Sequence, residues 1–294
     1  MSAGSWTLYE KSNQQDVLSF LKNWEYRNVN AGRQLSSLCR TPPPLLGSPK
    51  NLFLYRDQSR LMGLVVLGVH GLCLPLFSEE LSAEEGIAGV YGNLSLGHKD
   101  IGTLMGMKES VLPLESLFLG RIRDWVDYHF MVHRGKSVGV PLSSLGKIPR
   151  NLEIRRAFVS DAPALFPLQK EYELEEVVLN PERFNSDFCF QNLKRQLKDE
   201  VVLMALVNGK PVAKAGSNAT GIFFVQMGGV YTIPPFRSRG ISRLLVQTLI
   251  QEMAGRGKTF SLFVKKTNIP ALKVYDYTGF RIEGEFRITY LTRP

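Results

Sequence analysis

The chain has 294 residues and a mass of 33.1 kDa, about twice the size of a typical domain, which excludes a single small module and favours two domains. Its 44% hydrophobic and 21% charged residues are typical of a folded globular protein and exclude global disorder. The net charge of +9 favours anionic partners. Most of this charge lies in the second half, because residues 1–148 hold 15 basic and 13 acidic side chains, whereas residues 149–294 hold 21 and 14.

The first half mixes predicted helices and strands. Helices are expected at 14–39, 82–88 and 110–120, and strands at 51–55, within 61–77 and at 124–133. The long apolar run 61–77 contains Gly63, Gly68, His70, Gly71 and Pro75. These residues favour two buried strands joined by a glycine-rich turn over a membrane-spanning helix, which needs about 20 apolar residues with fewer breakers.

Residues 135–151 are rich in Gly, Ser and Pro, which is typical of a connection between domains. We therefore expect an N-terminal domain at 1–148 and a C-terminal domain at 149–294. In the second domain, strands are expected at 152–157, 201–207, 211–217, 221–232, 260–264 and 286–291, and helices after 160–161 and at 186–198, 241–254 and 270–277. Asn208-Gly209 predicts a tight hairpin turn between two of these strands.

The positions of the cysteines and the first residues of the chain indicate the cellular compartment in which the protein is expected. Cys39, Cys73 and Cys189 are far apart and form no CxxC pair, so they predict neither a disulfide framework nor a zinc cluster. The first residues lack the basic start and apolar core of a secretion signal. The sequence therefore predicts a cytoplasmic protein that does not insert into a membrane.

The segment PPFRSRGIS at 234–242 lies between a predicted strand and a predicted helix. Gly240 permits a backbone conformation and a close approach that a Cβ atom would hinder. The helix that begins near Ile241 adds unpaired N–H groups and the positive end of its dipole, which together suit a pyrophosphate. Arg237 and Arg239 add positive charge. The alternative is a glycine-containing loop that only caps a helix.

Residues 237–242, Arg-Ser-Arg-Gly-Ile-Ser, resemble the pyrophosphate loop Arg/Gln-x-x-Gly-x-Gly/Ala of the GNAT family, the acetyl-CoA-dependent N-acetyltransferases. Ser242 departs from Gly/Ala but is small and keeps its N–H. A second motif of the same family follows, with Asn268, Ala271 and Tyr275 spaced as Asn-x-x-Ala-x-x-x-Tyr before Thr-Gly-Phe. The resemblance implies an α/β (α+β) fold in the C-terminal half, with a mixed, mostly antiparallel sheet flanked by helices. The smaller α/β N-terminal domain loosely resembles a divergent, degenerate GNAT half.

The resemblance also implies site residues. The residues expected to bind the cofactor are Val230, Thr232, Arg237, Ser238, Arg239, Gly240, Ile241, Ser242 and Asn268. Tyr275 would deliver a proton to the departing thiolate, the alternative being a tyrosine that only packs in the core. The strand at 221–232 contains no carboxylate, so a general base is absent, water-mediated or supplied elsewhere. Glu175 and Glu176 are acceptor-site candidates, the alternative being a solvated helix face.

The sequence thus predicts an enzyme that transfers an acetyl group from acetyl-CoA to a primary amine by direct attack, without a metal. The N-terminal domain would form one wall of the acceptor site or a homodimer surface. Two alternatives stay open: a noncatalytic acyl-CoA-binding regulator, because the strand lacks a carboxylate, and an RNA-associated modifier, because the second half is basic. We do not expect nucleic-acid binding to be the main role.

Overall fold

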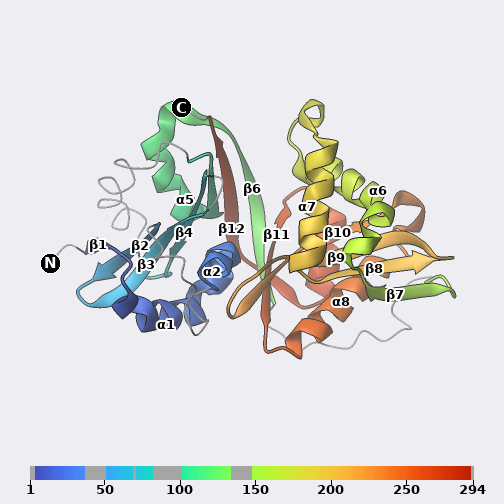
Figure 1. The fold of residues 1–294 in the computed structure, drawn as a ribbon, viewed down its shortest axis with the longest axis horizontal. Coiled ribbons are helices and arrows are strands. Elements are labelled where there is room, and N and C mark those ends of the chain that lie inside the picture. The colour runs from blue at the N-terminus through green and yellow to red at the C-terminus, as the bar shows by residue number, and fades with distance from the viewer. Residues whose placement is uncertain (1–3, 37–50, 69–70, 82–100, 134–147, 293–294) are drawn as a thin grey trace. The chain divides into compact units, whose positions relative to one another are not determined.

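A computed structural model describes residues 4–36, 51–68, 71–81, 101–133 and 148–292 (Figure 1). The chain forms two compact units, each discontinuous in sequence. Unit 1 comprises Met1–Phe130, Thr220–Phe224 and Ile282–Pro294, and unit 2 comprises Met131–Ala219 and Val225–Arg281. The division at residue 148 stays a prediction, and these compact units differ from it by exchanging segments.

Unit 1 contains a sheet in the strand order β1-β2-β3-β4-β5-β12-β6. The first three pairings are antiparallel, β4 and β5 are parallel, and β12 is antiparallel to β5. The elements of unit 1 are β1 (Ser5–Leu8), α1 (Gln14–Trp24), α2 (Val29–Leu35), β2 (Leu52–Asp57), β3 (Arg60–Leu67), β4 (Leu72–Phe77), β5 (Thr103–Met107), α5 (Lys108–Glu115), most of β6 (Ile122–His133) and most of β12 (Phe280–Leu291).

Helices cover both faces of the unit 1 sheet because its strands alternate apolar side chains on the two sides. Leu64 and Val66 of β3 pack in the cluster that contains α1 and α2, whereas Val65 and Leu67 pack in the cluster that contains α5. β2 and β4 divide their side chains in the same way. Unit 1 is therefore a three-layer α/β/α structure.

Unit 2 contains the strand order β11-β10-β9-β8-β7, with the end of β6 beside β11. β7, β8 and β9 pair antiparallel. The elements are β7 (Leu152–Arg156), α6 (Ala162–Tyr172), a π-helical turn (Glu173–Val177), α7 (Ser186–Asp199), β8 (Val202–Val207), β9 (Lys210–Thr220), β10 (Phe224–Thr232), α8 (Ile241–Ala254), β11 (Thr259–Lys265) and α9 (Ile269–Tyr277).

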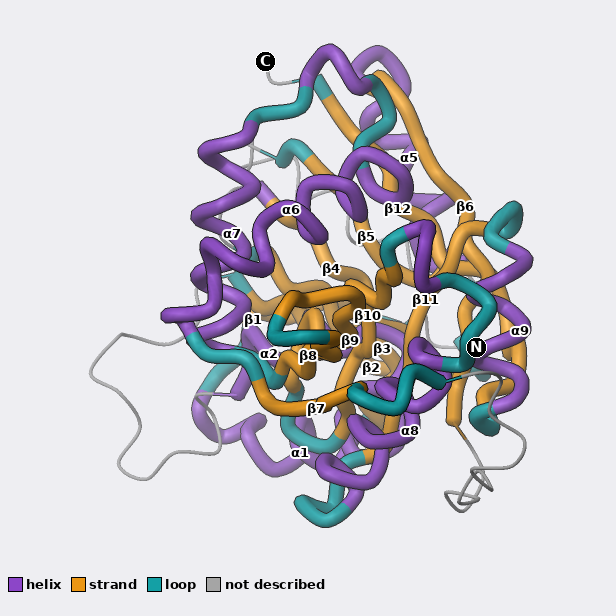
Figure 2. Tube along the Cα trace, turned by 90° about the vertical axis from the view of Figure 1, so that its right-hand side faces the viewer, coloured by secondary structure: helices purple, strands orange, loops and turns teal. Residues whose placement is uncertain are grey.

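The helices of unit 2 also lie on two sides of the sheet. Val202 and Met204 of β8 pack with α6 and α7, whereas Leu203 and Ala205 pack with α8 and α9. Figures 1 and 2 show α6 and α7 on one side of β8 and α8 on the other. The mixed, mostly antiparallel sheet flanked by helices is thus confirmed.

Several local predictions are confirmed. β3 and β4 form the expected antiparallel pair, and α8 has the expected bounds. Asn208 and Gly209 have φ values of 51° and 72°, as a tight hairpin turn with two left-handed residues requires.

Strands β1 and β5 were not expected from the sequence, and β12 begins earlier than the predicted 286. The helix expected at 82–88 and most of the predicted connection lie outside the described residues.

The loop Thr220–Phe224, which joins β9 to β10, belongs to unit 1 and is held there by Glu25. The Glu25 side chain is fully buried, and its carboxylate accepts the backbone N–H groups of Ile222, Phe223 and Phe224 at 2.7, 2.6 and 2.8 Å. Three N–H donors offset the cost of burying this carboxylate.

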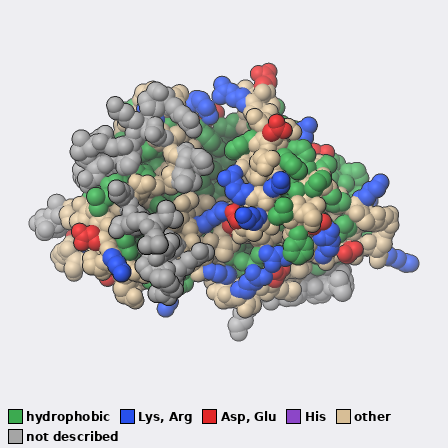
Figure 3. Space-filling model, in the orientation of Figure 1, with side chains coloured by type: hydrophobic (Ala, Val, Ile, Leu, Met, Phe, Trp, Pro, Cys, Tyr) green, Lys and Arg blue, Asp and Glu red, His purple; other side chains and the backbone are tan. Residues whose placement is uncertain are grey.

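The charged side chains of unit 2 do not form one continuous basic area on the face drawn in Figure 3, where Lys and Arg are interspersed with Asp and Glu. Among the residues that the structure describes, no helix is long and apolar enough to cross a membrane.

Candidate functional site

Unit 2 contains a cavity of about 750 Å³ at the point where β10 ends. It is lined by the end of β10, the loop that follows, the first turns of α8 and α9, and two residues of the π-helical turn. All of the predicted site residues line this cavity: Glu175, Glu176, Val230, Thr232, Arg237, Ser238, Arg239, Gly240, Ile241, Ser242, Asn268 and Tyr275. The structure therefore brings the two sequence motifs together, while the role of each residue stays a prediction.

The loop between β10 and α8 turns sharply before the helix. After a 3₁₀ turn at Pro234–Phe236, Ser238 and Gly240 have left-handed φ values of 61° and 83°. Gly240 occupies the position before the first residue of α8, and in the described structure no side chain caps the helix there. The first N–H groups of α8 and the positive end of its dipole thus face the cavity, as an anion site requires.

Ser242 connects the start of α8 to the end of β10. Its Oγ lies 2.7 Å from Oγ1 of Thr232, within hydrogen-bonding distance. The serine that departs from the Gly/Ala pattern therefore has an internal partner, and both residues line the cavity.

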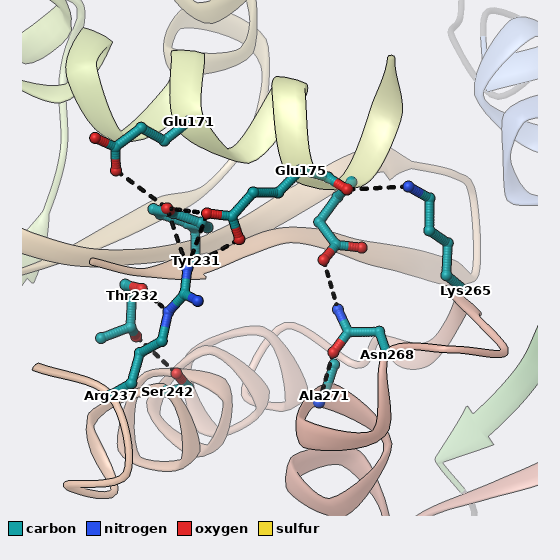
Figure 4. Close-up of polar contacts among 10 residues, drawn as sticks. Glu171, Glu175, Tyr231, Thr232, Arg237, Ser242, Lys265, Asn268 and Ala271 are labelled. Carbon is teal, nitrogen blue, oxygen red and sulfur yellow. Dashed lines mark hydrogen bonds and ion pairs between the residues drawn. The ribbon is translucent and has the colours of Figure 1, made fainter. Parts of the chain in front are cut away.

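The two loop arginines differ in their partners, and Figure 4 shows those of Arg237. The guanidinium of Arg237 donates to the Thr232 carbonyl oxygen at 2.9 Å and to the Glu175 carboxylate at 2.9 and 3.1 Å. Arg239 is exposed and lies 5.1 Å from the ring centroid of Phe236. Arg237 thus holds the loop against the π-helical turn, and Arg239 is the arginine whose charge is available to a ligand.

Tyr231 links β10 to α6 and the turn that follows it. Its hydroxyl oxygen lies 3.0 Å from Oε2 of Glu171 and 2.8 Å from Oε1 of Glu175, so the two carboxylates share its one proton, and it accepts a hydrogen bond from Arg237 at 3.1 Å (Figure 4). Burial, followed by these two carboxylates, raises the pKa of Tyr231. From the sequence this residue looked like an ordinary strand side chain, and nothing local reveals its distant partners.

Asn268 and Tyr275 form the second wall of the cavity. Oδ1 of Asn268 accepts the Ala271 N–H at 3.0 Å and so caps α9, while its Nδ2 donates to Oε1 of Glu176 at 2.9 Å (Figure 4). Tyr275 is 6% exposed and packs against Phe280. Burial, and secondarily the charge of Glu176, raises the pKa of Tyr275, so its hydroxyl stays protonated at neutral pH.

The acidic run after α6 is bound into the structure. Glu175 binds Arg237 and Tyr231, its carbonyl oxygen accepts a hydrogen bond from Lys265 Nζ at 3.0 Å, and Glu176 binds Asn268. The π-helical turn over Glu173–Val177 is a distortion that often occurs at functional sites.

A buried lysine lies next to β10 outside the lining of the cavity, and sequence reasoning missed it. Lys214 of β9 is 1% exposed, and its Nζ donates to the carbonyl oxygen of Gly229 at 3.0 Å. Burial lowers the pKa of Lys214 to about 8 and raises the pKa of the nearby Glu173. The signal that could have found it is a lone Lys in a central strand of small apolar residues (PVAKAG).

Comparisons with known proteins agree with this geometry. Residues 164–280 match the sequence model of the Acetyltransferase (GNAT) family. A Drosophila protein of known structure is 15% identical, with a TM-score of 0.64 and coverage of 98% of each chain. A GCN5-related N-acetyltransferase from Sphaerobacter thermophilus is 13% identical, with a TM-score of 0.54 and coverage of 100% of this chain and 97% of its own.

A tandem GNAT protein from the clavulanic acid biosynthesis pathway is 13% identical, with a TM-score of 0.52 and coverage of 99% of this chain and 98% of its own. No curated protein matches the sequence. The structural likenesses extend over both units and establish the fold, whereas the sequence match lies within the second half of the chain. The cavity, the two motifs and the sequence match lie in the same stretch of chain, and residues 164–280 are therefore a domain of the GNAT acetyltransferase family.

Proposed function

We propose that this protein is an N-acetyltransferase that uses acetyl-CoA and transfers the acetyl group to a primary amine by direct attack. The observation that carries the proposal is the cavity at the end of β10, where an uncapped helix start and a buried tyrosine line the same space. Family membership supports acyl transfer in general, and the acetyl donor and the amine acceptor are the parts that we propose.

The residues of the cavity fit the proposed cosubstrate. The N–H groups at the start of α8, the left-handed Gly240 and the exposed Arg239 suit the two charged phosphates. We assign the pantetheine arm to the main chain of Val230 and Thr232 and to Asn268. When bound, acetyl-CoA supplies an acetyl group that is activated as a thioester.

Tyr275 is the proposed general acid. Its raised pKa keeps the proton on the hydroxyl at neutral pH, so that the proton can pass to the sulfur as the C–S bond breaks and be replaced by the proton that the attacking amine loses. For Glu175 or Glu176 to serve the acceptor, each would have to release its partner, Arg237 or Asn268 respectively. We therefore propose that the acceptor reacts as the neutral amine.

The test is acetyl-CoA-dependent thiol release in the presence of pooled amines and peptides. We expect release by the wild type and by Tyr277→Phe, which changes an exposed tyrosine on the same helix, but about 100-fold less by Tyr275→Phe. Acetyl-CoA binding without thiol release from any pool would instead support the noncatalytic regulator, for which the absence of a carboxylate on β10 is the favouring observation.

A further inference from the structure

Lys214 is among the largest fully buried side chains of the described residues, and it carries an ammonium group. A lysine is almost never fully buried unless its charge has partners. The partners here are the carbonyl oxygen of Gly229 at 3.0 Å and the ring of Tyr172, whose centroid lies 4.8 Å from Nζ. Because the side chain emerges from β9 and reaches across to β10, its burial fixes one specific peptide group of the neighbouring strand.

That peptide group is unusual. Gly229 has a φ of 61° in the middle of β10, a left-handed conformation that marks a bulge in a strand. A Cβ at this position would lie 2.9 Å from Lys214 Nζ. The main chain of Gly229 also makes a hydrogen bond to the Tyr172 hydroxyl. Two side chains, one from β9 and one from α6, thus hold the bulge.

The carbonyl oxygen of Gly229 and the N–H of Val230 are opposite ends of one peptide group. Val230 lines the cavity, and its main chain is where the proposed function puts the pantetheine arm, whose sulfur carries the acetyl thioester. A cation at the carbonyl end fixes the plane of the peptide and polarises it, which makes the N–H a stronger donor. Such a donor stabilises the negative charge that develops on the thioester oxygen during attack.

We propose that Lys214 is a positioning residue for acetyl transfer, which orients and polarises the Gly229–Val230 peptide from its carbonyl end. The inference rests on the proposed function, because the thioester must meet Val230 for Lys214 to act on the reaction. Lys214 touches neither substrate and acts through the peptide alone.

The surroundings of Lys214 make this action dependent on pH. The charged and titratable groups that face it are Tyr172 of α6, Glu173 of the π-helical turn and Cys189 of α7. Burial, partly offset by the charge of Glu173, lowers the pKa of Lys214 to about 8. Burial also raises the pKa of Cys189 to about 11, so this thiol stays neutral while Lys214 titrates. The ammonium, and with it the polarisation of the peptide, is lost as the pH rises through about 8.

The first test is independent of turnover. In wild-type protein labelled with ¹⁵N-valine, the Val230 amide resonance, assigned with Val230→Ile, should shift with a midpoint near pH 8. In Lys214→Met this titration should be absent, and in Lys210→Met, which removes an exposed lysine from the same strand, it should be retained. A Val230 resonance that does not titrate in the wild type overturns the proposal, whether or not the protein is an acetyltransferase.

The second test separates positioning from packing. Lys214→Met should lower kcat for thiol release by about 10- to 100-fold while leaving the Kd for acetyl-CoA within about threefold of the wild type. The wild-type kcat should fall above pH 8, and the kcat of the variant should be flat over that range. An unchanged kcat, or a parallel loss of acetyl-CoA affinity, overturns the role in positioning. If the Val230 amide titrates but no amine yields thiol release, the proposed function fails while the effect of Lys214 on the peptide stands.

Discussion

Replacing Lys214 by Met should change how the stability of the protein depends on pH. Lys214 has an ordinary pKa of 10.5 when exposed and a pKa of about 8 in the folded protein. Between these values the unfolded chain binds one more proton than the folded chain, so the free energy of unfolding rises with pH. Below pH 8 both states carry the charge, and the folded state bears the full cost of burying it.

The magnitude follows from the difference of about 2.5 in pKa. Each pKa unit corresponds to about 1.4 kcal/mol, so the buried ammonium destabilises the folded state by about 3 kcal/mol at neutral pH. Methionine fills a similar volume without titrating. The stability of Lys214→Met relative to the wild type should therefore decline by about 2 kcal/mol between pH 7 and pH 9.5.

Urea denaturation followed by far-ultraviolet circular dichroism measures this difference. Circular dichroism is needed because the three tryptophans, Trp6, Trp24 and Trp125, all belong to unit 1 and do not report on unit 2. Lys210→Met is the control, and its stability relative to the wild type should stay constant over the same range. A constant difference for Lys214→Met, or one that grows with pH, would refute the reasoning that a buried ammonium sits on β9.

Three further changes test other parts of the structure. Tyr275→Phe should leave the melting temperature and the Kd for acetyl-CoA unchanged, because the ring still packs on Phe280. A fall in melting temperature at constant kcat would show instead that Tyr275 is a packing residue. Gly240→Val should weaken acetyl-CoA binding, measured by calorimetry, by more than Arg239→Ala does. A φ of 83° costs a β-branched residue about 1–2 kcal/mol, and the valine side chain adds bulk to the loop. Equal affinity in the wild type and Gly240→Val would exclude this loop as the phosphate site. Glu25→Gln should lower the free energy of unfolding, measured by urea denaturation, by at least about 2 kcal/mol, since an amide oxygen cannot accept all three N–H groups. An unchanged value would show that the carboxylate does not stabilise the fold.

The sequence predicted the parts of the structure that local residues determine. The bounds of α8 follow from its apolar spacing and from Gly240, and the hairpin turn follows from Asn208-Gly209. The loop and the Asn268 motif are short, so they identified the residues that line the cavity. That they lie in one cavity followed from the resemblance to a family rather than from any local pattern.

The interactions that the sequence did not predict join residues far apart in the chain. Glu25 accepts N–H groups nearly 200 residues away, and its partners are backbone groups that carry no sequence signal. Tyr231 and Lys214 are similar cases, because their roles depend on how α6 crosses β9 and β10. The parallel pairing of β4 with β5 was missed for the same reason, since strand pairing over long separations depends on tertiary packing more than on propensity.

The exchange of segments between the two units constrains the order in which the protein can fold during synthesis. The sheet of unit 1 needs β12 between β5 and β6, and residues 282–291 of that strand are translated after the segments of unit 2. Nascent chains usually complete their N-terminal domain first. Here β5 cannot pair with β12, and one of its edges stays unpaired, until unit 2 has been synthesised and has left the ribosome. Unit 1, whose first strands are made before unit 2, is therefore completed after it.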